Sequence, residues 1–297
     1  MKECGSVWNE TGLIFSEKEG RAWFAAFVIA FIVVLLLNAF TLAIYTRNRH
    51  LRKTSTYLII NLTVADLLIG TVTGASLPVF KADLESGNLT IKPVQDFNWQ
   101  SFVHLTLQGS FVVASLANIS LISLERLHAT VFPFRHCLVG TRVYLAIILC
   151  SWLFSLILSS VLALLYLHES PALLYVYTSY CFLIIFILTV SYAIIISTVK
   201  NNPPSPNAQP VLSTERKLTV TLFIVNVASI LTILPWVIWN VIGHHIAGNK
   251  LCPAVLSHIH YSFNLLYLFN SIVNPLIYAV RMQEFRKAAR KLFLLTH

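Results

Sequence analysis

Charged residues are scarce in this sequence of 297 amino acids, at 11% of the total, whereas 57% of the residues are hydrophobic. Soluble domains are about 25% charged and about 45–50% apolar, so this chain has too little charge to cover a water-facing surface. The composition therefore argues against a soluble enzyme. The formal net charge of +9 does not indicate a nucleic-acid partner either, because the mean hydropathy is +0.74 and nucleic-acid-binding surfaces are polar.

What the sequence has instead is seven long apolar stretches. Each can cross a hydrocarbon core of about 30 Å, which takes about 20 residues at helical rise. In lipid each must be a helix, because a strand would leave backbone groups without hydrogen-bond partners. We predict an all-α fold, an integral membrane bundle of seven transmembrane helices over residues 22–280. The predicted helices span about 22–46, 56–80, 98–126, 143–167, 172–199, 216–243 and 254–280.

The distribution of Lys and Arg predicts the orientation of the bundle. Fifteen of the 21 basic residues follow the first, third, fifth and seventh apolar stretches or lie at the adjoining helix ends. Because positive charge is retained on the cytoplasmic side, we expect an extracellular N-terminus over 1–21 at the plasma membrane. Residues 281–297 are expected to form a cytoplasmic amphipathic helix on the lipid surface and a short tail, with basic side chains facing anionic headgroups.

Two glycosylation acceptor sites and two cysteines fall in the predicted extracellular segments. Asn9 and Asn88 each begin an Asn-x-Thr sequence, which is the acceptor pattern. Cys4 and Cys252 are candidates for a disulfide, although free thiols at both positions fit the sequence nearly as well.

Inside the predicted membrane core the sequence places one ionisable residue, Asp66. Ionisable groups at this depth are costly and are therefore functional hypotheses by default. Other helices offer polar side chains near it, and a carboxylate ringed by hydroxyl and amide oxygens suits a small hard cation or a bound proton. A purely structural polar network is an equal alternative. These polar side chains are Asn38, Ser115, Asn270 and Asn274.

A second group of charges marks the cytoplasmic boundary. Glu125 precedes Arg126 at the inner end of the third helix, and Glu215 begins the sixth helix on the same side. An Arg–carboxylate pair there would hold the two helices together, and breaking it would open a cytosolic cleft. Solvated interfacial charges are the alternative interpretation. Pro275 is expected to kink the seventh helix, one turn before Tyr278.

Together these residues resemble the rhodopsin-like, class A G-protein-coupled receptors over essentially the whole chain. One or more matching residues lie on each predicted helix: Asn38, Asp66, Glu125-Arg126-Leu127, Trp152, Tyr192, Pro235 and residues 274–278 (NPLIY). The resemblance implies a receptor without catalytic residues that binds an extracellular ligand and activates a heterotrimeric G protein as the sixth helix moves outward.

The resemblance also implies roles for individual residues. A sodium ion is the one cofactor or metal it suggests, held by Asp66, Ser115, Asn270 and Asn274. The residues implied in activation and coupling are Glu125, Arg126, Tyr192, Glu215, Asn274, Pro275 and Tyr278.

Several positions depart from the family pattern. Ser101 replaces the helix-three cysteine of the usual outer disulfide, and the second outer loop is too short for a hairpin. Ile184 replaces the helix-five proline, Ser229 a core phenylalanine and Ile233 the switch tryptophan, with Trp236 nearby. The missing disulfide and short loop are similar to melanocortin-type receptors, but the subfamily and the basal activity stay open.

The expected ligand pocket is neutral. Gln108 stands where amine receptors carry an aspartate, and Leu268 where opsins carry the retinal lysine, so amines are disfavoured and a Schiff base is excluded. Neutral hydrogen-bonding groups among aromatics suit a small uncharged molecule, a peptide or a lipid. The expected lining residues are Gln108, Val112, Tyr177, Tyr180, Trp236, Asn240, His260 and Asn264.

Two other classes of membrane protein were weighed against a receptor. A transporter or channel would carry several ionisable residues along a path, often with internal repeats, whereas Asp66 stands alone. A membrane enzyme would need His, Asp or Glu clustered at one depth. The sequence therefore favours a receptor, with a transporter or channel as the alternative.

Overall fold

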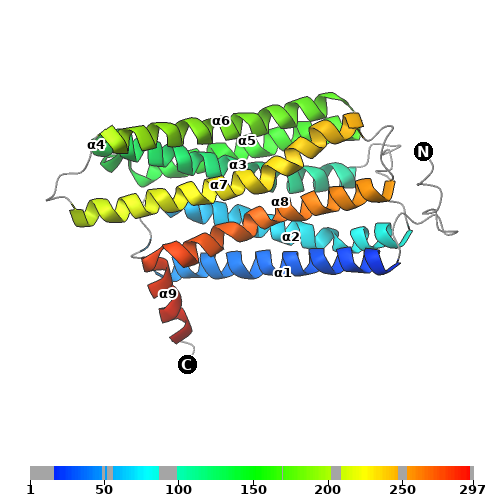
Figure 1. The fold of residues 1–297 in the computed structure, drawn as a ribbon, viewed down its shortest axis with the longest axis horizontal. Helices are drawn as coiled ribbons and strands as arrows, with labels where there is room; N and C mark the ends of the chain where they lie inside the picture. Colours follow the sequence, from blue (N-terminus) through cyan, green and yellow to red (C-terminus); the bar gives the residue numbers. More distant parts are fainter. Residues whose placement is uncertain are drawn as a thin grey trace.

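The computed structural model describes residues 17–48, 51, 56–86, 99–168, 170–201, 209–246 and 253–294. Within these ranges the chain is built from helices, and the long ones run side by side along a common direction (Figure 1). The helices are α1 (Glu17–Arg47), α2 (Thr56–Ser86), α3 (Trp99–Val131), α4 (Pro133–Cys137), α5 (Thr141–Leu167), α6 (Ala172–Asn201), α7 (Gln209–Ile246), α8 (Pro253–Arg281) and α9 (Gln283–Leu294).

Most of the long helices extend past the ends that hydropathy predicted. α1 begins at Glu17 instead of 22, α2 continues to Ser86 instead of 80, and α7 begins at Gln209 instead of 216. The physical reason is that hydropathy marks only the part of a helix that fits the lipid core, whereas backbone hydrogen bonding continues into polar surroundings. The predicted all-α membrane fold is confirmed, but its helices are longer than their apolar cores.

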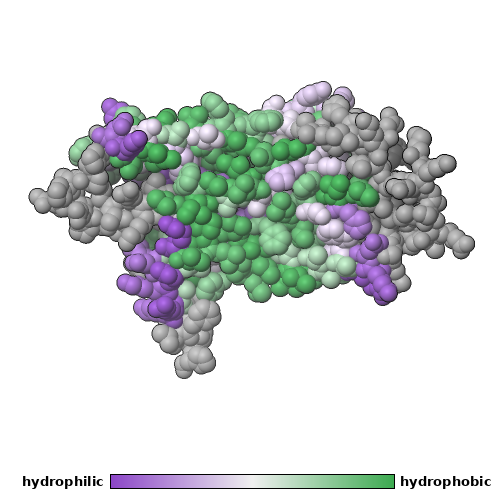
Figure 2. All heavy atoms as spheres, in the orientation of Figure 1, coloured by the Kyte–Doolittle hydropathy of each residue, from purple (hydrophilic) through white to green (hydrophobic). Residues whose placement is uncertain are grey.

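Apolar length and surface character agree with a membrane bundle. Among the described residues, five helices are long and apolar enough to cross a membrane by length and composition, and α2 and α7 contain shorter apolar segments, Thr56–Val72 and Val220–Trp236. Figure 2 shows apolar side chains over the middle of one face, with hydrophilic residues gathered on α9 and at the start of α1. We refer below to the end of the bundle that carries α4 and α9 as the α9 end.

α5 shows how the lipid reverses the usual burial pattern. Leu149, Leu153 and Ile157 recur every four residues and are exposed, whereas Ser155 and Ser159 on another face are buried. Small side chains allow membrane helices to approach closely. A Cβ added to Gly109 of α3 would lie 3.2 Å from the Ser159 hydroxyl oxygen, so α3 and α5 meet over small residues.

The contact between α1 and α2 is also close. A Cβ at Gly74 would lie 2.3 Å from the ring of Phe31, and one at Gly70 would lie 3.1 Å from side-chain carbons of Val34 and Leu35. Since real Cβ atoms do not approach that closely to a ring, only glycine fits at position 74 without a shift of the Phe31 ring or of α1.

A polar network joins α2, α3 and α5 at mid-length. The Trp152 indole N–H donates to Asn61 Oδ1 at 2.9 Å, and Asn61 Nδ2 donates to Asn118 Oδ1 at 2.6 Å. Asn61 and Asn118 are both buried. Both groups of the Asn61 amide and the oxygen of the Asn118 amide thus bond between helices, whereas Asn118 Nδ2 donates to the Ala114 backbone oxygen within α3 at 2.8 Å.

At the α9 end the chain forms two further helices. α4 was not predicted, although Pro133 at its first turn is a common helix start. α9 lies across the direction of the bundle (Figure 1), and its Phe285 ring packs 5.8 Å from the ring of Tyr45 and 6.5 Å from that of Tyr278, between centroids. The basic residues of α9 are exposed: Arg286, Lys287, Arg290 and Lys291.

Candidate functional site

The carboxylate of Asp66 is the centre of a buried polar cluster at mid-length of the bundle. Asp66 is 0% exposed. Its Oδ1 accepts hydrogen bonds from Ser115 of α3 at 2.7 Å and from Ser271 of α8 at 3.0 Å, and its Oδ2 accepts from Asn274 Nδ2 at 2.9 Å. These bonds satisfy a carboxylate that would otherwise be very costly to bury, and they join α2, α3 and α8.

Two of the residues expected around Asp66 have other partners. The Asn270 side-chain oxygen accepts from the Thr232 hydroxyl of α7 at 3.5 Å, and Asn38 Nδ2 donates to the backbone oxygens of Val34 and Ser271, each at 3.0 Å. Ser271 takes the place at Asp66 that was expected for Asn270. Adjacent helical residues point about 100° apart, so sequence alone does not resolve which of the two faces the carboxylate.

Unused oxygens next to this cluster fit a small hard cation. The amide oxygens of Asn274 and Asn38 are buried and have no hydrogen-bond partner among the described residues. An amide oxygen only accepts, so it is satisfied by a donor or by a metal ion, and carboxylate, hydroxyl and amide oxygens are the ligands that such ions prefer. The residues present therefore fit the expected ion.

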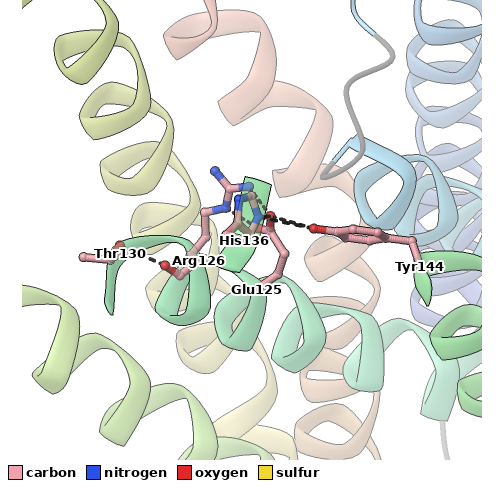
Figure 3. A network of polar contacts seen from close by, with 5 residues as sticks. All are labelled: Glu125, Arg126, Thr130, His136 and Tyr144. Carbon is pink, nitrogen blue, oxygen red and sulfur yellow. Dashed lines mark hydrogen bonds and ion pairs between the residues drawn. The ribbon is translucent and has the colours of Figure 1, made fainter. Parts of the chain in front are cut away.

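The Arg126 guanidinium lies in a second network, at the α9 end (Figure 3). Its Nη2 donates to Oε1 of the neighbouring Glu125 at 2.6 Å, and its Nε donates to Oε2 of the same carboxylate. The side chains of Arg126 and Glu125 are only 3% and 8% exposed. The pair is thus buried and bidentate, the strong form of an Arg–carboxylate contact.

Two residues that the sequence analysis missed complete this network. His136 of α4 places Nε2 2.8 Å from Glu125 Oε1, and the Tyr144 hydroxyl of α5 lies 3.3 Å from both Glu125 Oε1 and His136 Nε2. Figure 3 shows both side chains directed at the carboxylate. Pro133 marks the start of a short helix, but nothing in the sequence indicates that His136 of that helix faces Glu125.

The other expected coupling residues are only partly placed. The side chain of Glu215 lies outside the described residues, so its contact with Arg126 stays a prediction. The Tyr192 and Tyr278 hydroxyls are buried without a hydrogen-bond partner among the described residues. Their rings pack instead on Phe223, at 4.9 Å, and Phe285, at 6.5 Å. Pro275 lies inside α8, one turn before Tyr278.

Toward the opposite end, aromatic residues of three helices meet around Trp236. Its ring lies 5.1 Å from Tyr177 of α6 and 5.5 Å from Tyr267 of α8, between centroids. Its indole N–H donates to Asn264 Oδ1 at 2.8 Å. Three of the residues expected in a ligand pocket, Tyr177, Trp236 and Asn264, are thereby brought together.

The remaining expected pocket residues lie apart from this group, or their side chains already contact other parts of the bundle. The Tyr180 hydroxyl donates to the backbone oxygen of Val113 at 2.8 Å, and Val112 packs in an apolar cluster. Gln108 is half-buried and His260 is exposed. Five further expected residues have side chains outside the described part of the chain: Asn9, Asn88, Asn240, Cys4 and Cys252.

Between these two ends, α7 meets α3 and α6 over a small cavity of about 10 Å³. Leu116, Ile184 and Ile233 contribute apolar walls, and Ser229 of α7 also lines it. The Ser229 hydroxyl is buried and has no hydrogen-bond partner among the described residues. The position where the family pattern expects a phenylalanine thus carries a small polar side chain beside unfilled space.

Comparisons with known proteins agree with this arrangement. Residues 37–278 match the family described as 7 transmembrane receptor (rhodopsin family). The chain is 27% identical to melanocortin receptor 4 of Danio rerio over 270 residues, which cover 88% of this chain and 80% of that receptor. It is 26% identical to octopamine receptor beta-1R of Drosophila melanogaster over an alignment of 319 residues, covering 89% of this chain but only 60% of that receptor.

Proposed function

Because the chain belongs to the rhodopsin family of seven-transmembrane receptors, we propose that it transmits ligand binding at one end of the bundle to a heterotrimeric G protein at the α9 end. Membership of this family makes the chain a multi-pass membrane receptor, not an enzyme, and replaces the alternative of a transporter or channel. In the proposed topology the α9 end is cytosolic and the start of α1 is extracellular, at the plasma membrane.

The observation that carries the proposal is the buried Arg126–Glu125 pair. A guanidinium that is 3% exposed at the end of a membrane helix is held in place by its neighbour and is hidden from a large partner. An outward movement of α7 would give Arg126 a new exposed surface. Tyr192 and Tyr278 support this role, because their buried hydroxyls lack hydrogen-bond partners among the described residues and would gain them in a rearranged bundle.

The aromatic group around Trp236 supports ligand sensing at the opposite end. Tyr177 on α6, Trp236 on α7 and Asn264 on α8 join three helices, so a ligand that displaces one of them changes how the helices pack. The group is neutral, which favours a small uncharged molecule, a peptide or a lipid over an amine. We expect Gln108, Val112, Tyr180, Asn240 and His260 to contribute to the same pocket.

The Asp66 cluster supports regulation by a sodium ion. Asp66, Ser115 and Asn274 offer carboxylate, hydroxyl and amide oxygens at one place, and Asn270 lies on the neighbouring turn. A bound cation would supply positive charge opposite Asp66 and favour the packed arrangement of α2, α3 and α8.

The direct experiment replaces Arg126. We expect Arg126→Ala to abolish activation in cells that carry biosensors for each G-protein class, at a surface expression equal to that of the wild type. Arg142→Ala is the matched control, because Arg142 is an exposed arginine near the same end, on α5. Unchanged signalling by Arg126→Ala would remove the coupling role. In the same assay, Glu215→Ala should raise basal signalling if Glu215 restrains Arg126.

A further inference from the structure

The Glu125 carboxylate is held from three elements. Arg126 binds it along α3, His136 approaches from α4 at 2.8 Å and Tyr144 approaches from α5 at 3.3 Å (Figure 3). Tyr144 is 3% exposed, and the side chains of His136 and Glu125 are 22% and 8% exposed. The contacts therefore lie largely out of solvent, where each hydrogen bond to a charged group carries more weight than at a surface.

The direction of these hydrogen bonds follows from chemistry. A carboxylate only accepts, so His136 carries a proton on Nε2 and donates it, and Tyr144 donates its hydroxyl hydrogen. Glu125 Oε1 thus receives the Arg126 Nη2, His136 and Tyr144 donors together. Removal of one donor leaves a buried charge less well compensated, and the position of the carboxylate beside Arg126 becomes less fixed.

His136 is also what attaches α4 to the bundle. α4 has five residues, none of which is buried, and Phe134 is 89% exposed while Leu138, just beyond the helix, is 85% exposed. The partly buried His136 side chain contacts Glu125, and its ring lies 5.7 Å from that of His128 on α3. The arginine of α4, Arg135, lies over the ring of Phe132 at 5.8 Å.

We propose that His136 and Tyr144 are positioning residues for the Glu125–Arg126 pair, so that the restraint on Arg126 depends on whether α4 is seated against α3 and α5. Displacement of α4 by a partner would withdraw the His136 donor from Glu125 and loosen its hold on Arg126. The inference rests on the proposed function, since it names two further residues that regulate the same site.

The first test compares substitutions at position 136. Loss of one hydrogen bond to a charged group costs about 1.5–3 kcal/mol, and because the His136 side chain is 22% exposed we expect the lower end of that range, about a 10-fold shift of an equilibrium. His136→Phe should therefore raise basal G-protein activation by about 10-fold. His136→Gln keeps a hydrogen-bond donor, so its basal G-protein activation should stay near that of the wild type. His168→Phe makes the same change at an exposed histidine just past the opposite end of α5, so it is the matched control and should leave basal signalling unchanged. Tyr144→Phe should give a smaller rise than His136→Phe.

The second test asks whether His136 acts through Glu125. In a Glu125→Ala background, His136→Phe should have no additional effect on basal activation, because the group it positions is absent. If His136→Phe multiplies the basal signal by the same factor in both backgrounds, or if His136→Gln behaves like His136→Phe, the positioning role is overturned.

A third measurement separates this inference from the proposed function. Hydrogen exchange of the purified receptor reports directly on α4, whose His136 amide donates to the Phe132 carbonyl at 2.9 Å. His136→Phe should speed exchange at residues 136–139 by about 10-fold, and His168→Phe should not. If no variant activates any G protein, the proposed coupling is refuted, but the hydrogen-exchange result still stands. If exchange at residues 136–139 is unchanged in His136→Phe, the proposal that His136 holds α4 against α3 and α5 is refuted.

Discussion

The surroundings of Asp66 and of Ser229 differ sharply, although both residues are buried in the same bundle. Both oxygens of Asp66 accept hydrogen bonds, which come from α3 and α8. Ser229 of α7 borders a cavity, and its buried hydroxyl has no hydrogen-bond partner within the described part of the chain. The same is true of the buried amide nitrogen of Asn226, one turn earlier.

The difference indicates which helices are fixed and which can move. Hydrogen bonds to one carboxylate fix the rotation and depth of α2, α3 and α8 relative to each other. Among the described residues α7 has no comparable anchor at Ser229, and the cavity there forfeits packing contacts. Its hydrogen bonds to α8 come after Ser229, from Thr232 and Trp236. Movement of the part of α7 that precedes Ser229 therefore costs less than movement of α2, α3 and α8 around Asp66, which supports the proposed opening and gives a graded set of predictions for stability.

The largest effect is expected from Asp66→Ala, which leaves the donors of Ser115, Ser271 and Asn274 without their acceptor. Unsatisfied buried donors cost about 1–3 kcal/mol each, and with partial relaxation we expect a loss of about 3 kcal/mol. Chemical unfolding in detergent micelles measures it. Ser262→Ala is the control, because the exposed Ser262 hydroxyl bonds only within its own helix. A loss no greater than the control's would mean that the cluster does not fix the helices.

The next effect concerns the contact of α1 with α2. Gly74→Val should destabilise the protein by about 2 kcal/mol, as overpacking of a tight interface does, because its Cβ would overlap the ring of Phe31. Gly140→Ala is the matched control, since nothing lies within 4 Å of a Cβ there. The midpoint of thermal unfolding should be clearly lower for purified Gly74→Val than for Gly140→Ala. Equal midpoints would show that the Phe31 ring or α1 moves aside at little cost.

A smaller loss is expected from Trp152→Phe. The substitution keeps the ring near Phe111 but removes the N–H that donates to Asn61, and one hydrogen bond contributes about 1 kcal/mol. Trp239→Phe, at an aromatic contact on α7, provides the comparison, because no described hydrogen bond of its indole is removed. If both variants unfold alike, the network at Asn61 contributes little.

The smallest effect should have the opposite sign. Ser229→Val removes an unpaired hydroxyl and fills part of the cavity, so we expect a gain of about 0.5–1 kcal/mol and lower basal signalling as α7 packs more firmly. Ser229→Ala should gain less, because it leaves the cavity empty. Unfolding and biosensor assays on the two variants measure both quantities. Destabilisation by Ser229→Val would show that the cavity is needed for packing.

Hydropathy and charge were sufficient to predict the fold because the lipid restricts it to helices of one minimum length. The cluster at Asp66 was partly predictable: Ser115 and Asn274 contact it, but Ser271 replaces Asn270. That choice depends on helix rotation near Pro275, which a linear pattern does not encode. The contact of His136 with Glu125 depends on how the five-residue helix α4 packs against α3. A segment that short has too few residues for a hydrophobic periodicity to predict which side chain faces the bundle.

The tucked ring of Phe285 has a consequence for the order of assembly. Phe285 is 1% exposed and packs between Tyr45 at the end of α1 and Tyr278 at the end of α8. Synthesis proceeds from the N-terminus, so Tyr45 leaves the ribosome about 240 residues before the ring that covers it. The first helix inserted into the membrane therefore meets α8 before the Tyr45 ring at its end is covered, and that ring waits for α9, the last of the described helices to be made.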